Sequence, residues 1–153
     1  MNHRDFRHRL PLRVRWAEVD RQGVVFNAHY LLYADVCATE YWRAVGMRYP
    51  DDFEPLASDL YVRKATVDYR AAALYDDELE VCGRIARIGG SSLQFTVAMF
   101  RRGEPQAPLV EVDLVYVYVD VATKAPRRVD DALRARIRAF ETVAPDEAVA
   151  GAR

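Results

Sequence analysis

The sequence has few of the residues that metal sites and disulfide frameworks require. It contains two cysteines, Cys37 and Cys82, and three histidines, His3, His8 and His29. Two cysteines form neither a disulfide framework nor a zinc-finger pattern, and so few histidines argue against a histidine-rich site. The sequence therefore predicts no metal. A chain so poor in cysteine is typical of a reducing compartment, and we expect a cytoplasmic protein.

Long apolar runs and an excess of charge are also missing. No stretch approaches the ~20 apolar residues that cross a bilayer, and the start of the chain lacks the apolar region of a secretory signal. We therefore expect no membrane association. The formal net charge is −1, whereas a dedicated nucleic-acid binder is strongly basic, so we expect no nucleic-acid partner. A length of 153 residues with 51 % hydrophobic content predicts one globular domain.

Motifs that hold common cofactors or nucleophiles are absent as well. The sequence has no phosphate-binding Walker loop and no dinucleotide-binding glycine fingerprint. The glycines and serines at 89–92 indicate a hairpin turn, since no G-x-S-x-G motif is present. We therefore expect no cofactor. Cys37 falls on the apolar face of a predicted helix, which favours a core position over a nucleophile.

Apolar periodicity predicts an α+β fold. Alternation at Leu12, Val14 and Trp16 indicates a first strand, and a broad apolar face predicts a helix over 27–45. Further strands are expected at 61–71, 79–88, 92–101 and 109–120, and a short helix after Asp130. This order predicts a largely antiparallel five-stranded sheet packed around one long central helix. We expect a core at about 10–141, with flexible residues at 1–9 and 144–153.

The last strand predicts an oligomer. Val115, Val117 and Val119 alternate with Tyr116 and Tyr118, so both faces of this strand are apolar. A single helix covers only one face of a sheet, and a sheet that is apolar on both faces needs a cover on each. We therefore expect a homo-oligomer that buries the second face.

The segment from Asp20 to Tyr30 carries the residues for chemistry. Asp20 lies in a polar turn, Gly23 permits a left-handed backbone, and an apolar stretch leads to the helix. The helix start at Asn27 presents unpaired N–H groups and the positive end of the helix dipole. Such N–H groups can hold the oxyanion of an acyl-transfer reaction. The carboxylate can attack a carbonyl carbon or activate a water molecule.

This segment resembles the active-site signature of hot-dog-fold acyl-CoA thioesterases of the 4-hydroxybenzoyl-CoA thioesterase type. The matching positions are Asp20, Gly23, Val24, Val25, Phe26, Asn27 and Tyr30. The order of a strand, a long helix and four strands is also that of the hot-dog fold. The resemblance implies hydrolysis of an acyl-CoA thioester to a free acid and CoA, in an assembly of hot-dog dimers that we expect to be a homotetramer.

The resemblance also assigns roles to these residues. It makes Asp20 the catalytic carboxylate, either as nucleophile or as general base. The backbone N–H of Asn27 would polarise the thioester carbonyl, a role that needs no particular side chain. The other matched positions would shape the loop and bind the substrate: Gly23, Val24, Val25, Phe26 and Tyr30. Coenzyme A is then part of the substrate and not a cofactor.

The chain departs from the family pattern at a few positions. Val19 stands where several relatives have a small polar residue, and Gly89-Gly90 stands where some have basic residues near the nucleotide end of coenzyme A. Contacts to its phosphates must therefore come from elsewhere. The candidates by charge alone are Arg63, Lys64, Arg87, Arg127 and Arg128.

Two alternatives remain open at this point. The first is a non-catalytic acyl-CoA-binding module or regulator on the same fold, which would not need Asp20. The second is a hot-dog hydratase or dehydratase, which pairs an acid with a histidine. Only His29 could serve there, and its spacing from Asp20 differs from that motif. The sequence does not reveal the acyl group.

Overall fold

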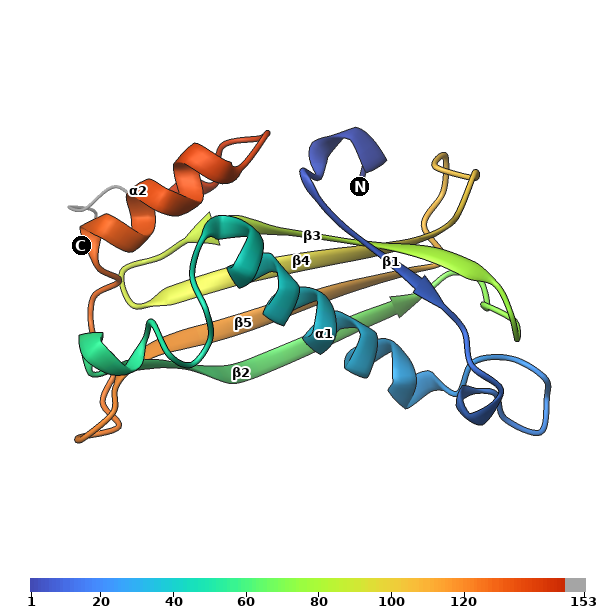
Figure 1. Ribbon diagram of the computed structural model, residues 1–153, viewed down its shortest axis with the longest axis horizontal. Helices are drawn as coiled ribbons and strands as arrows, with labels where there is room; N and C mark the ends of the chain where they lie inside the picture. Colours follow the sequence, from blue (N-terminus) through green and yellow to red (C-terminus); the bar gives the residue numbers. More distant parts are fainter. Residues whose placement is uncertain (148–153) are drawn as a thin grey trace.

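Five strands form one antiparallel sheet, and a long helix lies across one of its faces (Figure 1). The computed structural model describes residues 1–147. The strands are ordered β1-β3-β4-β5-β2 across the sheet. The elements are β1 His8–Arg13, α1 Asn27–Val45, β2 Ser58–Tyr69, β3 Glu78–Ile88, β4 Ser92–Arg101, β5 Val110–Asp120, α2 Asp131–Phe140 and β6 Asp146–Glu147. The predicted α+β sheet with one long helix is therefore confirmed.

Helix α1 forms the centre of the core. The residues of its inner face are buried among side chains of the sheet: Tyr30, Tyr33, Ala34, Cys37, Ala38, Tyr41, Trp42 and Val45. Leu31 was expected on this face but is exposed, beside exposed Leu32 and Val36. Gly46 ends the helix in the left-handed conformation (φ 85°), which glycine adopts without steric cost. Burial of so many large apolar side chains is the main force that holds α1 on the sheet.

Strands β1 and β6 differ from the prediction. Strand β1 ends at Arg13, and Trp16 begins a short 3-10 helix, Trp16–Glu18, in which it is exposed. The chain turns there because Val14 is the last residue that bonds to the chain next to β3. Its N–H donates to the carbonyl of Asp77 (3.0 Å). The two-residue β6, which runs parallel to the end of β3, was not predicted.

Strand β2 is an edge strand, paired on one side with β5. It carries exposed apolar side chains over much of its length, including Tyr61, Val62 and Tyr69. A register shift between Val62 and Lys64 marks an irregularity that bends the strand. Within the described residues, the other edge of β2 has no strand beside it.

Helix α2 and the chain after it close the end of the sheet near the β3–β4 turn (Figure 1). Leu133 and Ile137 are buried, as predicted, and the guanidinium of buried Arg134 donates to the carbonyls of Gly89 and Gly90. Asp130 precedes α2 but its carboxylate does not cap the helix; it accepts a hydrogen bond from the hydroxyl of Tyr118 instead (2.6 Å). The predicted flexible segment at 144–153 falls partly outside the described residues, which end at 147.

The N-terminal segment covers part of the sheet face opposite α1. Phe6 is 1 % exposed and packs with Cys82, Ala98 and Phe100 in a cluster separate from the core under α1. The terminal amine of Met1 forms an ion pair with Glu111 (2.9 Å). Phe6 and this ion pair hold part of the segment 1–9, which was expected to be flexible, against the sheet. Among the described residues, no helix is long and apolar enough to cross a membrane.

Candidate active site

Asp20 lies at the turn of a small hairpin that leads into α1. Its N–H donates to the carbonyl of Val24 (2.9 Å), and its carbonyl accepts from the N–H of Gly23 (2.9 Å). Gly23 has a φ of 79°, so the turn needs the left-handed backbone that glycine supplies. The carboxylate is half-buried, and its Oδ1 accepts a hydrogen bond from the N–H of Gln22 (2.7 Å). Its Oδ2 accepts no hydrogen bond from the described residues, which leaves it open to a ligand.

The start of α1 offers unpaired donors on the same hairpin. Phe26 is the N-cap residue in extended conformation, and no side chain caps the helix. The N–H groups of Asn27 and Ala28 make no hydrogen bond to another described residue, as is usual for a first helical turn. Asn27 was expected as the cap residue; it is instead the first residue of the helix. Its backbone N–H therefore stands where a negatively charged oxygen is favoured.

A buried acid, Glu18, braces this hairpin. It is 4 % exposed, and its carboxylate accepts hydrogen bonds from the hydroxyl of Tyr33 (2.7 Å) and from Arg15. Burial opposes ionisation of Glu18, but the bonds from Arg15 and Tyr33 outweigh it and hold its pKa below the ordinary value. The carbonyl of Glu18 accepts from the N–H of Phe26 (2.9 Å), which fixes the residue just before α1. The sequence pattern placed Glu18 in a polar turn and contained no sign of its burial.

The chain before β3 fastens the hairpin from the other side. The N–H of Val25 donates to the carbonyl of Ala73 (2.9 Å), and the N–H of Ala73 donates to the hydroxyl of Tyr30 (2.9 Å). The carboxylate of Asp77, in the same segment, forms an ion pair with the guanidinium of Arg101 (3.0 Å). Hydrogen bonds from Glu18, just before the hairpin, and from the distant segment near Ala73 therefore preorganise the loop that carries Asp20.

The structure divides the predicted substrate-binding residues into two groups. Val25 and Tyr30 are buried in the core, which gives them a packing role within a single chain. Phe26 is 48 % exposed, Val24 is half-buried and Gly23 is exposed, so these three remain accessible beside Asp20.

Two of the five basic candidates for phosphate contacts have acidic partners. Arg127 pairs with Asp130, and Arg128 pairs with Asp131 (2.7 Å). Arg63, Lys64 and Arg87 form no ion pair with a described residue. Exposed Arg21, next to Asp20 in the turn, was not among the candidates for phosphate contacts.

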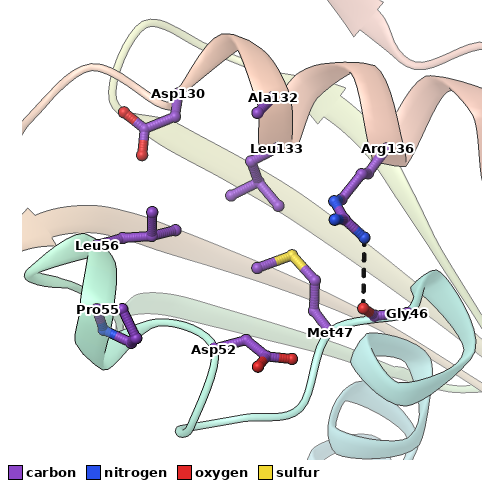
Figure 2. Close-up of a pocket in the computed structure, with 9 residues that line it drawn as sticks. All are labelled: Gly46, Met47, Asp52, Pro55, Leu56, Asp130, Ala132, Leu133 and Arg136. Atoms are coloured by element: carbon purple, nitrogen blue, oxygen red, sulfur yellow. Dashed lines mark hydrogen bonds between the residues drawn. The ribbon is translucent and has the colours of Figure 1, made fainter.

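A cavity lies at the opposite end of α1 (Figure 2). It encloses about 410 Å³ between the chain after α1 and helix α2. Figure 2 shows Met47 and Leu133 pointing into it, and Arg136 donating to the carbonyl of Gly46 (3.4 Å). The sequence pattern contained no sign of this cavity, because it forms only when α2 packs near the end of α1.

Comparison with known proteins decides the family. The profile of the thioesterase superfamily matches residues 22–107. The chain belongs to the thioesterase superfamily. The YbgC protein of Escherichia coli, named an acyl-CoA thioester hydrolase, is 30 % identical over 133 residues, which cover 85 % of this chain and 95 % of the relative. The prediction of a thioester hydrolase is therefore confirmed at the level of the family.

Solved structures confirm the hot-dog fold. The PA5185 protein of Pseudomonas aeruginosa has a TM-score of 0.79 at 24 % identity, over 94 % of this chain and 97 % of that one. A thioesterase from Thermus thermophilus, solved with coenzyme A and Zn, has a TM-score of 0.76 at 29 % identity, over 91 % of this chain and 97 % of that one.

Proposed function

We propose that this member of the superfamily hydrolyses acyl-CoA thioesters with Asp20 as the catalytic carboxylate. One observation carries the proposal. A carboxylate oxygen of Asp20 and the N–H groups at the start of α1 occur together on one hairpin, and neither has a partner among the described residues. The E. coli relative, named an acyl-CoA thioester hydrolase, supports the substrate class. The Thermus thermophilus thioesterase was solved with coenzyme A, which supports it further.

The proposed mechanism begins with the thioester carbonyl oxygen at the N–H of Asn27. Asp20 takes a proton from a water molecule, whose oxygen attacks the carbonyl carbon. The oxyanion that forms is stabilised by the N–H of Asn27 and by the helix dipole. When the oxyanion collapses, the C–S bond breaks and CoA leaves as a thiolate, which takes up the proton held by Asp20. The acid is released.

Asp20 as nucleophile is the other form of the same proposal. The carboxylate then attacks the carbonyl carbon, the thiolate leaves, and water hydrolyses the resulting anhydride. Neither form of the proposal uses a cofactor or a metal, because the thiolate of CoA is a good leaving group. We propose the cytoplasm as the compartment in which the enzyme meets its substrate.

A second copy of the chain is the proposed partner. Leu32 and Val36 on the outer side of α1 are exposed, as are Tyr61 and Val62 on β2. A groove of about 130 Å³ lies between α1 and β2, lined by Asp35, Ala38, Thr39, Trp42, Tyr49, Leu60, Val62 and Tyr116. We propose that a homo-oligomer, a dimer or a tetramer of hot-dogs, covers this surface and that the acyl group lies in the interface.

Oligomer formation can be measured by light scattering after gel filtration. Val36→Asp places an unpaired charge in the proposed interface and is expected to shift the mass to that of a single chain. Arg43→Asp, on the polar side of the same helix, is the matched control and should leave the mass unchanged. A single-chain mass for the unaltered protein would contradict the proposed assembly.

The function itself is tested by release of CoA from short, long and aromatic acyl-CoAs. We expect the protein to release CoA from at least one of them with multiple turnovers. Stoichiometric binding of acyl-CoA with no CoA released would favour the regulator, and conversion of an enoyl-CoA without CoA release would favour the hydratase. Either result would overturn the thioesterase proposal for this chain.

A further inference from the structure

The N-terminal segment brings a histidine onto the outer face of the sheet. Phe6 lies over Cys82, and the guanidinium of Arg9 holds the segment by donating to the carbonyls of His3 (3.3 Å) and Phe6 (3.2 Å). The ring of His3 stands edge-on against Phe100, with 5.0 Å between ring centroids. The position of this histidine is therefore fixed by packing against Phe100 and by the hydrogen bonds of Arg9 to the backbone at His3 and Phe6.

His3 meets two possible metal ligands from β3. Its Nε2 lies 2.6 Å from a carboxylate oxygen of Glu80. The Sγ of Cys82 completes a group of three donor atoms that all lie within 4.8 Å of one another. Glu80 and Cys82 are two residues apart on one strand, so their side chains project from the same face of the sheet. The sequence pattern predicted no metal site because the segment with His3 was expected to be mobile.

These three donors suit zinc. Imidazole nitrogen, thiolate sulfur and carboxylate oxygen are all common zinc ligands, with bonds of about 2.0–2.3 Å in a tetrahedron. Tetrahedral ligand atoms at such bond lengths are about 3.3–3.8 Å apart. The Nε2 of His3 and the carboxylate oxygen of Glu80 therefore move apart from 2.6 Å to admit the ion, and side-chain adjustments within the 4.8 Å group bring the three donors to this spacing. Neutral His3 with two anionic ligands balances the charge of a divalent cation. This balance favours the ion in a site where Cys82 is fully buried.

We propose that His3, Glu80 and Cys82 bind a zinc ion that fastens the N-terminal segment to the outer face of the sheet. Water occupies the fourth position, on the side where the site is open. The side chains of His3 and Glu80 are 14 % and 32 % exposed, and they provide the path by which the ion enters. The ion is structural: it lies across the sheet from α1, and the hydrolysis proposed for Asp20 does not use it.

The test uses the full chain without a tag, because a histidine tag binds metal and an N-terminal tag displaces Met1. The protein is stripped with a chelator, and binding of Zn²⁺ alone is measured by calorimetry and by metal analysis. We expect one ion per chain. Co²⁺ in place of Zn²⁺ should give the absorption band of a thiolate bound to cobalt.

Two variants remove one ligand each. Cys82→Ser should abolish the thiolate–cobalt band. His3→Gln should weaken Zn²⁺ binding by ~100-fold or more, since even groups outside the ligand shell cost roughly 10- to 100-fold when lost. Cys37→Ala and His29→Gln are matched controls, because they remove the same residue types away from this cluster. Both controls should bind Zn²⁺ as the unaltered protein does.

Thermal unfolding separates loss of metal from loss of fold. Zn²⁺ should raise the Tm of the unaltered protein, because an ion that binds only the folded state stabilises it. It should not raise the Tm of His3→Gln, whose Tm without metal should show a folded protein. If Zn²⁺ does not bind, or if Cys82→Ser and His3→Gln bind it as the controls do, the proposal is wrong and His3–Glu80 is an ion pair only.

Discussion

The two ends of helix α1 differ in what their polar groups contact. At the C-terminal end, the N–H of Gly46 bonds to the carbonyls of Arg43 and Trp42, and Arg136 donates to the carbonyl of Gly46. The acids there are also paired, Asp52 with Arg48 and Asp130 with Tyr118. At the N-terminal end, the N–H groups of Asn27 and Ala28 and one oxygen of Asp20 have no partner among the described residues.

This difference is the reason that the proposed site lies at the N-terminal end of α1 and not at the cavity near its C-terminal end. The C-terminal end holds a cavity of about 410 Å³, where Arg136 donates to the carbonyl of Gly46 (Figure 2). Asp52 and Asp130 beside it accept hydrogen bonds from Arg48 and Tyr118. The N-terminal end holds groups that Glu18 and Ala73 keep in place without satisfying them. Groups kept in place without partners can stabilise charge that develops during a reaction. Four pairs of variants test the N-terminal end of α1 against matched positions elsewhere in the molecule.

The largest effect is expected at Asp20. Asp20→Asn keeps the oxygen that accepts from the N–H of Gln22 but removes the charge, so kcat should fall by ~10²- to 10⁴-fold. Asp52→Asn makes the same change at the other end of α1 and should leave kcat within about twofold. The measurement is steady-state release of CoA. Equal effects of the two variants would contradict the comparison.

The backbone donor of Asn27 gives the next largest effect. Proline is tolerated at the first helical position and has no N–H, and Phe26 already has the extended conformation (ψ 135°) that a residue before proline prefers. Asn27→Pro should therefore lower kcat by ~10²- to 10³-fold while the circular dichroism stays that of the unaltered protein. Asn27→Ala keeps the N–H and should retain activity. Loss of activity in both variants would assign the role to the side chain.

The turn at Gly23 should respond through its backbone. A Cβ at Gly23 meets no atom within 4 Å, but the φ of 79° disfavours any side chain. Gly23→Ala should lower the free energy of unfolding by about 1–2 kcal/mol. Gly90→Ala has the same open surroundings without a positive φ, so it should change stability by less than ~0.5 kcal/mol. Urea unfolding of both variants measures the difference in the free energy of unfolding. Equal losses would contradict the claim that the turn requires glycine at position 23.

Two buried acids should give opposite pH dependences of stability. The pKa of Glu18 is lowered in the folded protein, so its stabilisation is present above its ordinary pKa of 4.5 and is lost as pH falls through the folded pKa. Burial raises the pKa of Glu141, so its stabilisation is present below 4.5 and is lost as pH rises through the folded pKa.

Urea midpoints measured between pH ~3 and ~7 test this contrast. Glu18→Gln should make the protein less sensitive to acid. Glu141→Gln should remove a loss of stability that sets in as pH rises above 4.5. Parallel pH profiles for the two variants would show that the pKa shifts do not have opposite signs.

Much of the fold follows from local sequence pattern. The period of α1, the alternation in β3 to β5 and the glycines at 89–90 each predict the element that forms, because local spacing decides them. The placement of Phe6 and the burial of Glu18 depend on partners far along the chain, such as Cys82 and Tyr33. No local pattern encodes such contacts, so the sequence did not predict where the N-terminal segment packs.

The candidate site shows the same division. The sequence identified Asp20, Gly23 and the start of α1, because turn chemistry and helix ends are local features. It did not reveal that Val25 is buried in the core, or that Ala73 binds both Val25 and Tyr30. Those facts depend on how the chain before β3 packs against the hairpin.

Hydrogen exchange with a bound substrate analogue tests most directly which end of α1 receives the thioester. A ketone analogue, with a methylene group between sulfur and carbonyl carbon, binds without being hydrolysed. The account predicts that the unpaired amides of Asn27 and Ala28 exchange rapidly in the free protein and slowly in the complex, while 46–56 and 130–136 do not change. Protection of 46–56 and 130–136, with unchanged exchange at Asn27 and Ala28, would contradict it.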